Sequence, residues 1–384
     1  MHAELTNSTI SESTQKKASQ IIESCVHCGF CLATCPTYQI LGDELDSPRG
    51  RIYLIKSALE QNQFTQKSLS HMDRCLTCRS CETTCPSGVE YGQLLEIGRE
   101  IMESKRGKFQ TLYRYLVRKA LLTPIIFKPI GYFYRHSKIS SKPIKPETIQ
   151  SRVLLMGGCV QPSLAPNINH SIKNILAKLN IEVLESSQGQ CCGALDQHLA
   201  ASSEAMKKVK RNIDNWIAQL DSGVEAIISS ASGCGVMIKD YPKLFKSSDP
   251  YFKKALLVSS KTKDIAEFLS NKDLSGLHLS ELNITYHEPC TMQHGQQLGG
   301  LVESILSQFG YIKKPVKDSH ICCGSAGAYS IFETKISNQL RDNKIDNLNA
   351  SKPNMIVTSN IGCLMHLQKG SSIPVKHWVE LLDV

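Results

Sequence analysis

The amino-acid sequence predicts an α+β multidomain protein, in which an N-terminal α-helical domain is followed by two repeated α/β domains with mostly parallel strands. Three observations lead to this fold class. Two similar cysteine runs lie 50 residues apart within the first hundred residues. From Ser151 onward, short apolar stretches alternate with amphipathic helical patterns, which is typical of parallel sheets covered by helices. A second cysteine pattern occurs twice in that part of the chain, about 130 residues apart.

The N-terminal cysteine runs, CVHCGFCLATCP and CLTCRSCETTCP, both have the spacing C-x2-C-x2-C-x3-C-P. Bacterial ferredoxins use this run to hold a pair of 4Fe-4S clusters, with the fourth cysteine binding the other cluster. Zinc also favours Cys-x2-Cys, but it takes two separated pairs and leaves the third cysteine and the Cys-Pro unexplained. We therefore expect two clusters, cluster 1 held by Cys25, Cys28, Cys31 and Cys85, and cluster 2 held by Cys75, Cys78, Cys81 and Cys35.

Helical patterns accompany the two runs. An amphipathic helix is predicted between them, from Arg49 to Gln61, and a second helix follows the second run, from Gly92 to Ser104. Residues 1–102 are thus predicted to form a dicluster 4Fe-4S ferredoxin domain. Residues 103–150 form a basic, aromatic-rich connector that contains four prolines.

The net charge of +9 is concentrated in this connector. Eleven Lys or Arg and no Asp or Glu lie between Lys105 and Lys145, so the rest of the chain sums to −2. No nucleic-acid-binding motif accompanies this charge, and we expect no nucleic-acid partner. Basic residues interleaved with Tyr, Phe, Leu and Ile suit either an anionic membrane surface or an acidic face of a partner subunit.

The sixteen cysteines are expected to bind metal in a reducing compartment rather than to form disulfides, because the polar N-terminus has no apolar signal segment. The longest apolar stretch, near Ala120–Phe127, falls far short of the roughly 20 residues that span a bilayer. These features predict a soluble or peripheral protein.

In the second half, buried strands are predicted at Val153–Met156, Val183–Glu185 and Val224–Ser230, with helices at Asn167–Leu179 and Glu204–Leu220 between them. This alternation predicts an α/β domain.

A duplicated cysteine pattern divides the second half into a domain at 151–280 and a domain at 281–384. A lone cysteine, a Cys-Cys-Gly and a final cysteine recur at offsets of 131, 131 and 129 residues. The lone and the final cysteine each follow a predicted strand, at the sheet edge where helix N-termini favour thiolates or an anionic cluster. The two sets are Cys159, Cys191, Cys192 and Cys234, and Cys290, Cys322, Cys323 and Cys363.

Each set of four is compatible with an iron–sulfur cluster, a zinc ion or a redox-active disulfide. Buried core cysteines are a further alternative, which the doubling at matched positions disfavours. Histidines near these sets, His198 and His287, are expected to be structural. Arg74, Arg79 and His27 lie in or beside the N-terminal loops and are expected to be solvated rather than to tune a cluster.

The C…CCG…C pattern resembles the cysteine-rich CCG domains of heterodisulfide reductases, of the third subunit of anaerobic glycerol-3-phosphate dehydrogenase, and of glycolate oxidase. Where such domains carry a non-cubane cluster, a fifth cysteine completes a final C-x-x-C. Met237 and His366 stand at that position here, which disfavours the non-cubane cluster and disulfide-reducing chemistry. His366 is a candidate extra ligand.

Nearly the whole chain resembles the iron–sulfur subunits of bacterial glycolate oxidase. The strings TCPTYQ, DSPRGRI, GCVQPSLAPNIN, YHEPCTMQHGQ and CCGSAGAYS carry this resemblance. It implies an electron-transfer subunit without catalytic residues of its own. This subunit receives electrons from the FAD of partner subunits that oxidise glycolate to the 2-oxo acid, with D-lactate as a second candidate substrate. It further implies a quinone-level acceptor and a cytoplasmic location in peripheral contact with the inner membrane.

No Gly-rich dinucleotide motif opens a βα unit, so hydride chemistry is not expected in this chain. Two alternatives to glycolate oxidase stay open. One is the iron–sulfur subunit of another flavin dehydrogenase, for glycerol 3-phosphate or D-lactate. The other is a thiol–disulfide reductase that acts at the CCG cysteines.

Overall fold

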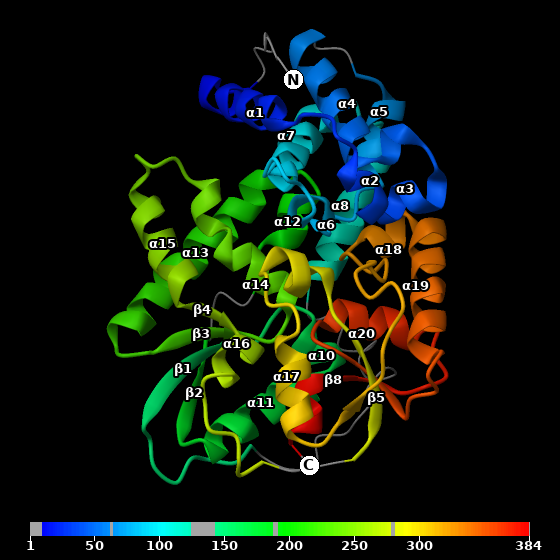
Figure 1. Ribbon diagram of the computed structural model, residues 1–384. Helices are drawn as coiled ribbons and strands as arrows, with labels where there is room; N and C mark the ends of the chain where they lie inside the picture. Colours follow the sequence, from blue (N-terminus) through cyan, green and yellow to red (C-terminus); the bar gives the residue numbers. More distant parts are fainter. Residues whose placement is uncertain (1–9, 62–63, 124–142, 187–190, 278–280, 384) are drawn as a thin grey trace. The chain divides into compact units, whose positions relative to one another are not determined.

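The structure is a computed structural model that describes residues 10–61, 64–123, 143–186, 191–277 and 281–383 (Figure 1). It divides into two compact units. The first comprises Met1–Arg118, Leu195–Ser202 and His320–Lys344, and the second comprises Lys119–Ala194, Ser203–Ser319 and Ile345–Val384. Each unit combines segments from several predicted domains, and the boundaries expected from the sequence stay predictions.

The N-terminal part of the first unit is helical. Its helices α1, α4 and α7 bury one apolar face each, and residues such as Ile22, Leu59, Leu94 and Met102 form a common core. The predicted helices around the cysteine runs are confirmed as α4 and α7, with bounds that differ by one residue. The elements are α1 (Glu12–Ser24), α2 (Phe30–Thr34), α3 (Pro36–Leu41), η1 (Glu44–Asp46), α4 (Pro48–Gln61), α5 (Gln66–Asp73), α6 (Ser80–Thr83), α7 (Tyr91–Glu103) and α8 (Lys108–Leu122).

Helices α4 and α7 pack closely against each other. Proline is favoured at the first position of a helix, and α4 begins at Pro48. Gly98 of α7 permits the close approach, because a Cβ there would lie 2.6 Å from Cγ1 of Ile55 on α4. The N-terminal ends of both helices therefore reach the two cysteine loops.

The second unit contains two four-stranded sheets in which all strand pairs are parallel. The strand orders are β2-β1-β3-β4 and β6-β5-β7-β8, so each repeat places its first strand between its second and third. This matched topology accords with the duplication predicted from the cysteines. The strands are β1 (Ser151–Met156), β2 (Ile181–Glu185), β3 (Ala226–Ser229), β4 (Thr262–Asp264), β5 (Asn283–His287), β6 (Ile312–Lys313), β7 (Met355–Thr358) and β8 (Val375–His377).

Helices of moderate length connect these strands, as the alternating pattern predicted (Figure 1). The two predicted helices are present as α11 and α13. The third predicted strand, Val224–Ser230, is shorter in the structure, where β3 comprises Ala226–Ser229. The remaining elements, some of which lie in the first unit, are α10 (Gln161–Leu164), α11 (Pro166–Lys178), α12 (Ala194–His198), α13 (Ser202–Asp221), α14 (Ser232–Lys239), η2 (Tyr241–Leu244), α15 (Pro250–Lys261), α16 (Ile265–Leu269), the π-helix η3 (Thr291–Gly295), α17 (Leu301–Gln308), α18 (Tyr329–Phe332), α19 (Thr334–Asn349), α20 (Ile361–Gln368) and η4 (Trp378–Leu381).

The central strands of each sheet end side by side. Met156 of β1 pairs in register with Ser229 of β3, and His287 of β5 pairs with Thr358 of β7. These strands are largely buried, as expected of parallel strands with covered faces. Cys159 and Cys290 follow the first strand of their repeats, and Cys234 and Cys363 follow the third.

Hydrogen bonds join the two repeats inside the second unit. The ring of His377 bonds to the carbonyl oxygen of Ser230 over 2.9 Å, and the hydroxyls of Ser232 and Thr291 lie 2.7 Å apart. The edge that follows the strands of the first repeat therefore contacts the second repeat.

Candidate iron–sulfur and metal sites

Both N-terminal cysteine loops have the same backbone conformation. The residues flanking the second cysteine are left-handed in each loop: His27 (φ 57°) and Gly29 (φ 85°) in the first, and Thr77 (φ 53°) and Arg79 (φ 61°) in the second. Left-handed residues within a right-handed turn direct successive N–H groups to one side, which suits an anionic cluster. The repeated spacing thus produces two equivalent cradles.

Two cavities of similar size, about 440 and 390 Å³, lie at these loops. Each is lined by the first three cysteines of one run and by a fourth from the other run. Four thiols around one cavity are the ligands that a 4Fe-4S cluster requires, so the residues fit two clusters. The first cavity contains Cys25, Cys28, Cys31 and Cys85, and the second contains Cys75, Cys78, Cys81 and Cys35, while Cys81 also borders the first.

The two cavities differ in their exposure to solvent. Cys28 in the first loop is exposed, as are the neighbouring Val26 and Phe30, at 66% and 61%. The equivalent Leu76 and Ser80 of the second loop are buried, at 5% and 2%. The first cavity therefore lies at a more exposed loop than the second, in which Cys78 is half-buried. We call the first the exposed site and the second, whose loop is more buried, the enclosed site.

Burial keeps several of these cysteines protonated in the absence of metal. It raises the pKa of Cys31 to about 11 and that of Cys81 well above the ordinary thiol value. A cluster binds thiolates, so insertion of a cluster would release protons from these thiols, which are neutral in its absence.

A buried charge network borders the second cavity. Arg51 of α4 is 1% exposed; its Nε donates to the carbonyl oxygen of His71 (2.7 Å) and its Nη2 donates to the hydroxyl of Thr37 (3.1 Å). The same Nη2 lies 3.3 Å from Oδ1 of the fully buried Asp46. Asp46 also pairs with Arg74 at 2.9 Å, and its Oδ1 lies 3.0 Å from Nδ1 of His71.

This network touches the predicted ligands of cluster 2. The Thr37 hydroxyl lies 3.3 Å from Sγ of Cys35, and the hydroxyl of Tyr91 donates to Sγ of Cys75 over 3.5 Å. Burial raises the pKa of Tyr91 well above its usual value, so this hydroxyl keeps its proton. Burial alone would lower the pKa of Arg51, but Tyr91, Cys75, Cys35 and Asp46 raise it, and the guanidinium remains charged.

The cysteine spacing carried no signal for Arg51, Asp46 or Tyr91. Of the strings noted in the sequence, DSPRGRI contains both Asp46 and Arg51. Of the residues noted beside the loops, Arg74 belongs to the network and Arg79 lies 4.0 Å from Glu82. Burial, followed by the nearby Arg49, lowers the pKa of His27.

The first CCG repeat brings its four predicted cysteines together. Cys159 follows β1, and Cys234 is the third residue of α14, which begins directly after β3. Hydrogen bonds link Cys159 with Cys191 and Cys192 with Cys234; these bonds, together with burial, raise the pKa of Cys159 and Cys192 well above the ordinary value. The four thiols thus lie close enough together to bind one metal site or to form a disulfide, and both roles require the thiolate.

Polar side chains fix the backbone of the Cys-Cys pair. Asn212 donates to the carbonyl oxygen of Cys191, and the hydroxyl of Tyr241 donates to that of Cys192, both over 2.9 Å. The following Gly193 has φ 89°, which explains the glycine in the motif.

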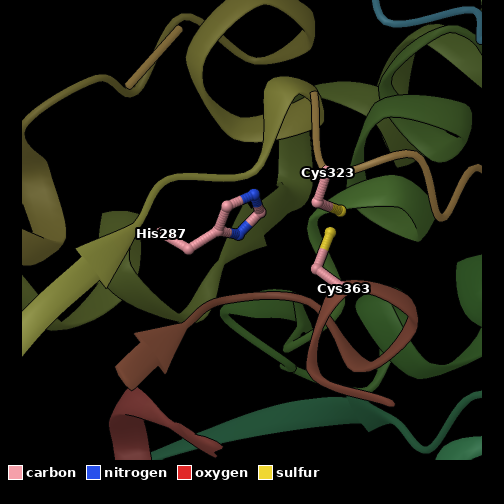
Figure 2. Close-up of side chains that lie close together, drawn as sticks. All are labelled: His287, Cys323 and Cys363. Atoms are coloured by element: carbon pink, nitrogen blue, oxygen red, sulfur yellow. The ribbon is translucent and has the colours of Figure 1, made fainter. Parts of the chain in front are cut away.

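In the second repeat, His287 and Cys363 form a close pair within the second unit (Figure 2). Both are buried, and their ligand atoms lie within 4.8 Å of each other. Nδ1 of His287 is 3.0 Å from the Thr358 hydroxyl, and Asn360 donates to Sγ of Cys363 over 3.4 Å. We expected His287 to be only structural; its position makes it a candidate ligand.

The remaining predicted ligands of this repeat occupy separate segments. Cys290 lies three residues after the end of β5 and immediately before η3, and His366 is buried one turn after Cys363 on α20. Cys323, the third residue labelled in Figure 2, belongs with Cys322 to the first unit, where Cys322 accepts from the N–H of Gly324 over 3.4 Å.

The part of the connector that the structure describes has an apolar outer face. In α8, Arg114 lies 3.3 Å from Asp73 and Arg118 lies 2.7 Å from Asp196, so these two charges pair inward. Phe109, Leu112 and Leu116 are exposed at 83%, 55% and 55%. The rest of the connector, 124–142, lies outside the described residues. Among the described residues, no helix is both long and apolar enough to cross a membrane.

Comparisons with known proteins agree with this organisation. Residues 21–89 match the 4Fe-4S dicluster domain family, and residues 153–239 and 284–368 match the cysteine-rich domain family. The dicluster match implies two 4Fe-4S clusters, as the cysteine runs predicted.

Curated relatives extend the match to the full chain. The glycolate oxidase iron-sulfur subunit of Escherichia coli (strain K12) is 43% identical over 401 residues, covering 100% of this chain and 98% of the relative. The probable glycolate oxidase iron-sulfur subunit of Bacillus subtilis (strain 168) is 29% identical, covering 90% and 88%. Lactate utilization protein A of Bacillus subtilis (strain 168) is 25% identical and covers 60% of this chain and 99% of its own length.

Proposed function

Because the chain belongs to the family of glycolate oxidase iron–sulfur subunits, we propose that it carries electrons from the flavin of a partner subunit to an acceptor outside the complex. The chain is a subunit of an oxidoreductase complex, and substrate oxidation takes place in the partner. The observation that carries the proposal is the pair of adjoining cavities, each lined by four cysteines. When bound, 4Fe-4S clusters pass one electron at a time, which suits a two-electron flavin whose electrons leave singly.

The residues around the two cavities would hold the clusters and control their surroundings. Cysteines 25, 28, 31 and 85 bind cluster 1, and cysteines 75, 78, 81 and 35 bind cluster 2. The crossed arrangement is supported by the location of Cys85 at the first cavity and of Cys35 at the second. The second site has the more buried loop, while the first has the exposed Cys28.

Further metal binding is proposed for both CCG repeats. The hydrogen bonds that join Cys159 with Cys191 and Cys192 with Cys234 support a cluster in the first repeat. In the second repeat, the proximity of His287 to Cys363 supports a set in which His287 joins the predicted cysteines, in addition to or instead of His366.

The proposed partners are FAD-binding subunits that oxidise glycolate, and the proposed acceptor is at the level of quinone. The names of the full-length relatives support glycolate. The relatives named lactate utilization protein A support D-lactate as a second candidate substrate of the complex. The exposed apolar face of α8 supports attachment of this subunit to a partner or to the membrane on the cytoplasmic side.

The test is chemical analysis of the anaerobically purified chain, followed by reduction through its partner. About eight iron and eight sulfide per chain would indicate the two N-terminal clusters alone. A content of about twelve to sixteen would indicate clusters in the CCG repeats as well. Mixing with the flavin subunit and glycolate should then bleach the cluster absorption. A colourless zinc protein, or clusters that glycolate and the flavin subunit fail to reduce, would contradict the proposal.

A further inference from the structure

The two cluster sites share one backbone design but have different electrostatic surroundings. The site lined by Cys25 is open to solvent, with Cys28 exposed. The site lined by Cys75 is enclosed and borders Arg51, whose side chain is 1% exposed. Charges act more strongly in an enclosed, low-dielectric site than beside water.

The charged groups around the enclosed site carry a net positive charge. Two guanidinium groups, Arg51 and Arg74, flank the carboxylate of Asp46, at 3.3 and 2.9 Å. Arg79, which lines the cavity, lies 4.0 Å from Glu82, and Arg99 donates to the carbonyl oxygen of Cys75 over 2.7 Å. The guanidinium group does not lose its proton in proteins, so this excess does not depend on pH. Reduction adds one negative charge to a cluster, and a nearby positive group stabilises that charge.

Hydrogen bonding acts in the same direction. The Tyr91 hydroxyl donates to Sγ of Cys75, and hydrogen bonds to cluster sulfurs are among the factors that set reduction potential. Tyr91 is fully enclosed, at 4% exposure, so water does not compete for its proton.

We propose that Arg51 and Tyr91, opposed by the negative charge of Asp46, set the reduction potential of the enclosed cluster and hold it above that of the exposed cluster, so that electrons enter at the exposed site and move inward. This inference rests on the proposed electron-transfer function. One electron leaves the exposed cluster and one enters the enclosed cluster; the step requires no proton and no further reactant. Arg51, Asp46 and Tyr91 are positioning residues, since they act through the potential and bind no metal.

The experiment is an anaerobic redox titration of the full-length, cluster-loaded chain, followed by EPR. A chelated paramagnetic ion in solution identifies the exposed cluster, because it broadens that signal more. The wild-type chain should show two potentials, with the enclosed cluster reduced first. R51Q and Y91F should lower the potential of the enclosed cluster, D46N should raise it, and the exposed cluster should change little in all three.

Opposite signs separate tuning from simple damage to the fold. A variant that merely loosens the site would change the potential in the same direction for R51Q and D46N. The double variant R51Q/D46N removes both charges, avoids an unpaired buried carboxylate, and should fall between the single variants. K56Q removes a positive charge from the same helix, at an ion pair with Glu60, and serves as the matched control.

Equal potentials in the wild type, or shifts of the same sign in R51Q and D46N, would overturn the inference. If clusters are present and the flavin subunit reduces them, the proposed function survives that result. If the chain contains no clusters, the proposed function fails before any titration is made.

Discussion

The chain contains two duplications, and they have diverged in different ways. In the cysteine loops, the ligand spacing and the left-handed residues recur at an offset of 50. In the CCG repeats, the cysteines recur, as do the glycine after the Cys-Cys pair and the glycine before the final cysteine, but other neighbours do not: Met156 corresponds to His287, and Ala231 corresponds to Asn360. A loop whose ligands are close in sequence needs one backbone shape. Ligands delivered by separate strands depend on the sheet, so the residues between them are free to change.

The edge strands of the two sheets show this divergence most clearly. Asp264 ends β4 and His377 ends β8, each in register with the end of the neighbouring strand. Each caps the following helix in a capping box, with Glu267 and Glu380 respectively. The same structural task is thus performed by an acid in one repeat and by a base in the other.

The largest effect is expected from the crossed fourth cysteines. Cys85→Ser should remove the exposed cluster, and Cys35→Ser should remove the enclosed one, because each lines the cavity of the other run. Each variant should lose about four iron atoms, measured by iron and sulfide analysis with EPR. If Cys85→Ser instead removed the enclosed cluster and spared the exposed one, the crossed assignment would be wrong.

A second prediction concerns the unequal ligand sets of the repeats. His287→Ala should lower the metal content of the second repeat, because its ligand atom lies within 4.8 Å of that of Cys363. Met156→Ala, at the matched position, should leave the metal content unchanged. Metal analysis would be made in a background lacking the N-terminal clusters. A loss in His366→Ala alone would favour His366 as the ligand.

The third prediction is opposite pH dependence at the two caps. Burial lowers the pKa of His377 to about 4, from the ordinary value of 6.5. Between these two pH values the histidine of the unfolded chain is protonated, whereas that of the folded chain is neutral. The free energy of unfolding is therefore highest above pH 6.5 and falls towards pH 4, by about 3 kcal/mol at most. His377→Gln should flatten the acid limb of the unfolding free energy.

Asp264 should act in the other direction. Burial raises its pKa from 3.8 to about 6, so the folded chain holds a proton that the unfolded chain releases. Stability therefore falls as the pH rises through this window, by about 3 kcal/mol at most. Asp264→Asn should stabilise the chain at pH 7 but not near pH 4, as measured by denaturant unfolding under anaerobic conditions. Equal effects at both pH values would contradict this explanation.

The smallest effect is expected where the two loops differ in residue but not in backbone. Gly29→Ala should destabilise its loop by about 1 kcal/mol, because φ is 85° and a Cβ would meet the Arg49 side chain at 3.3 Å. Arg79→Gly, at the matched position with φ 61°, should change stability by less than about 1 kcal/mol, since relief of strain opposes added chain entropy. Thermal midpoints of the two anaerobic variants would test this. A larger loss in Arg79→Gly would point to a role for its side chain.

Much of this protein was evident from the sequence because the signals are local. The cysteine spacing indicated two clusters, and apolar periodicity located α4, α7, α11 and α13 and the central strands of the first sheet. The offsets of about 130 residues indicated the duplication. In each case the residues that carry the signal lie within one turn, one strand or one repeated unit.

Only the tertiary structure revealed the surroundings of the sites. Asp46, Arg51, His71 and Tyr91 come from four separate segments, and no spacing rule brings them together. His287 and Cys363 meet because β5 and β7 are neighbours in a sheet, although 76 residues separate them in sequence. Sequence indicated the two 4Fe-4S clusters, since the ligand chemistry of cysteine and its spacing are local properties of the chain. Packing decided which charges and hydrogen bonds face those ligands, since burial depends on the whole fold.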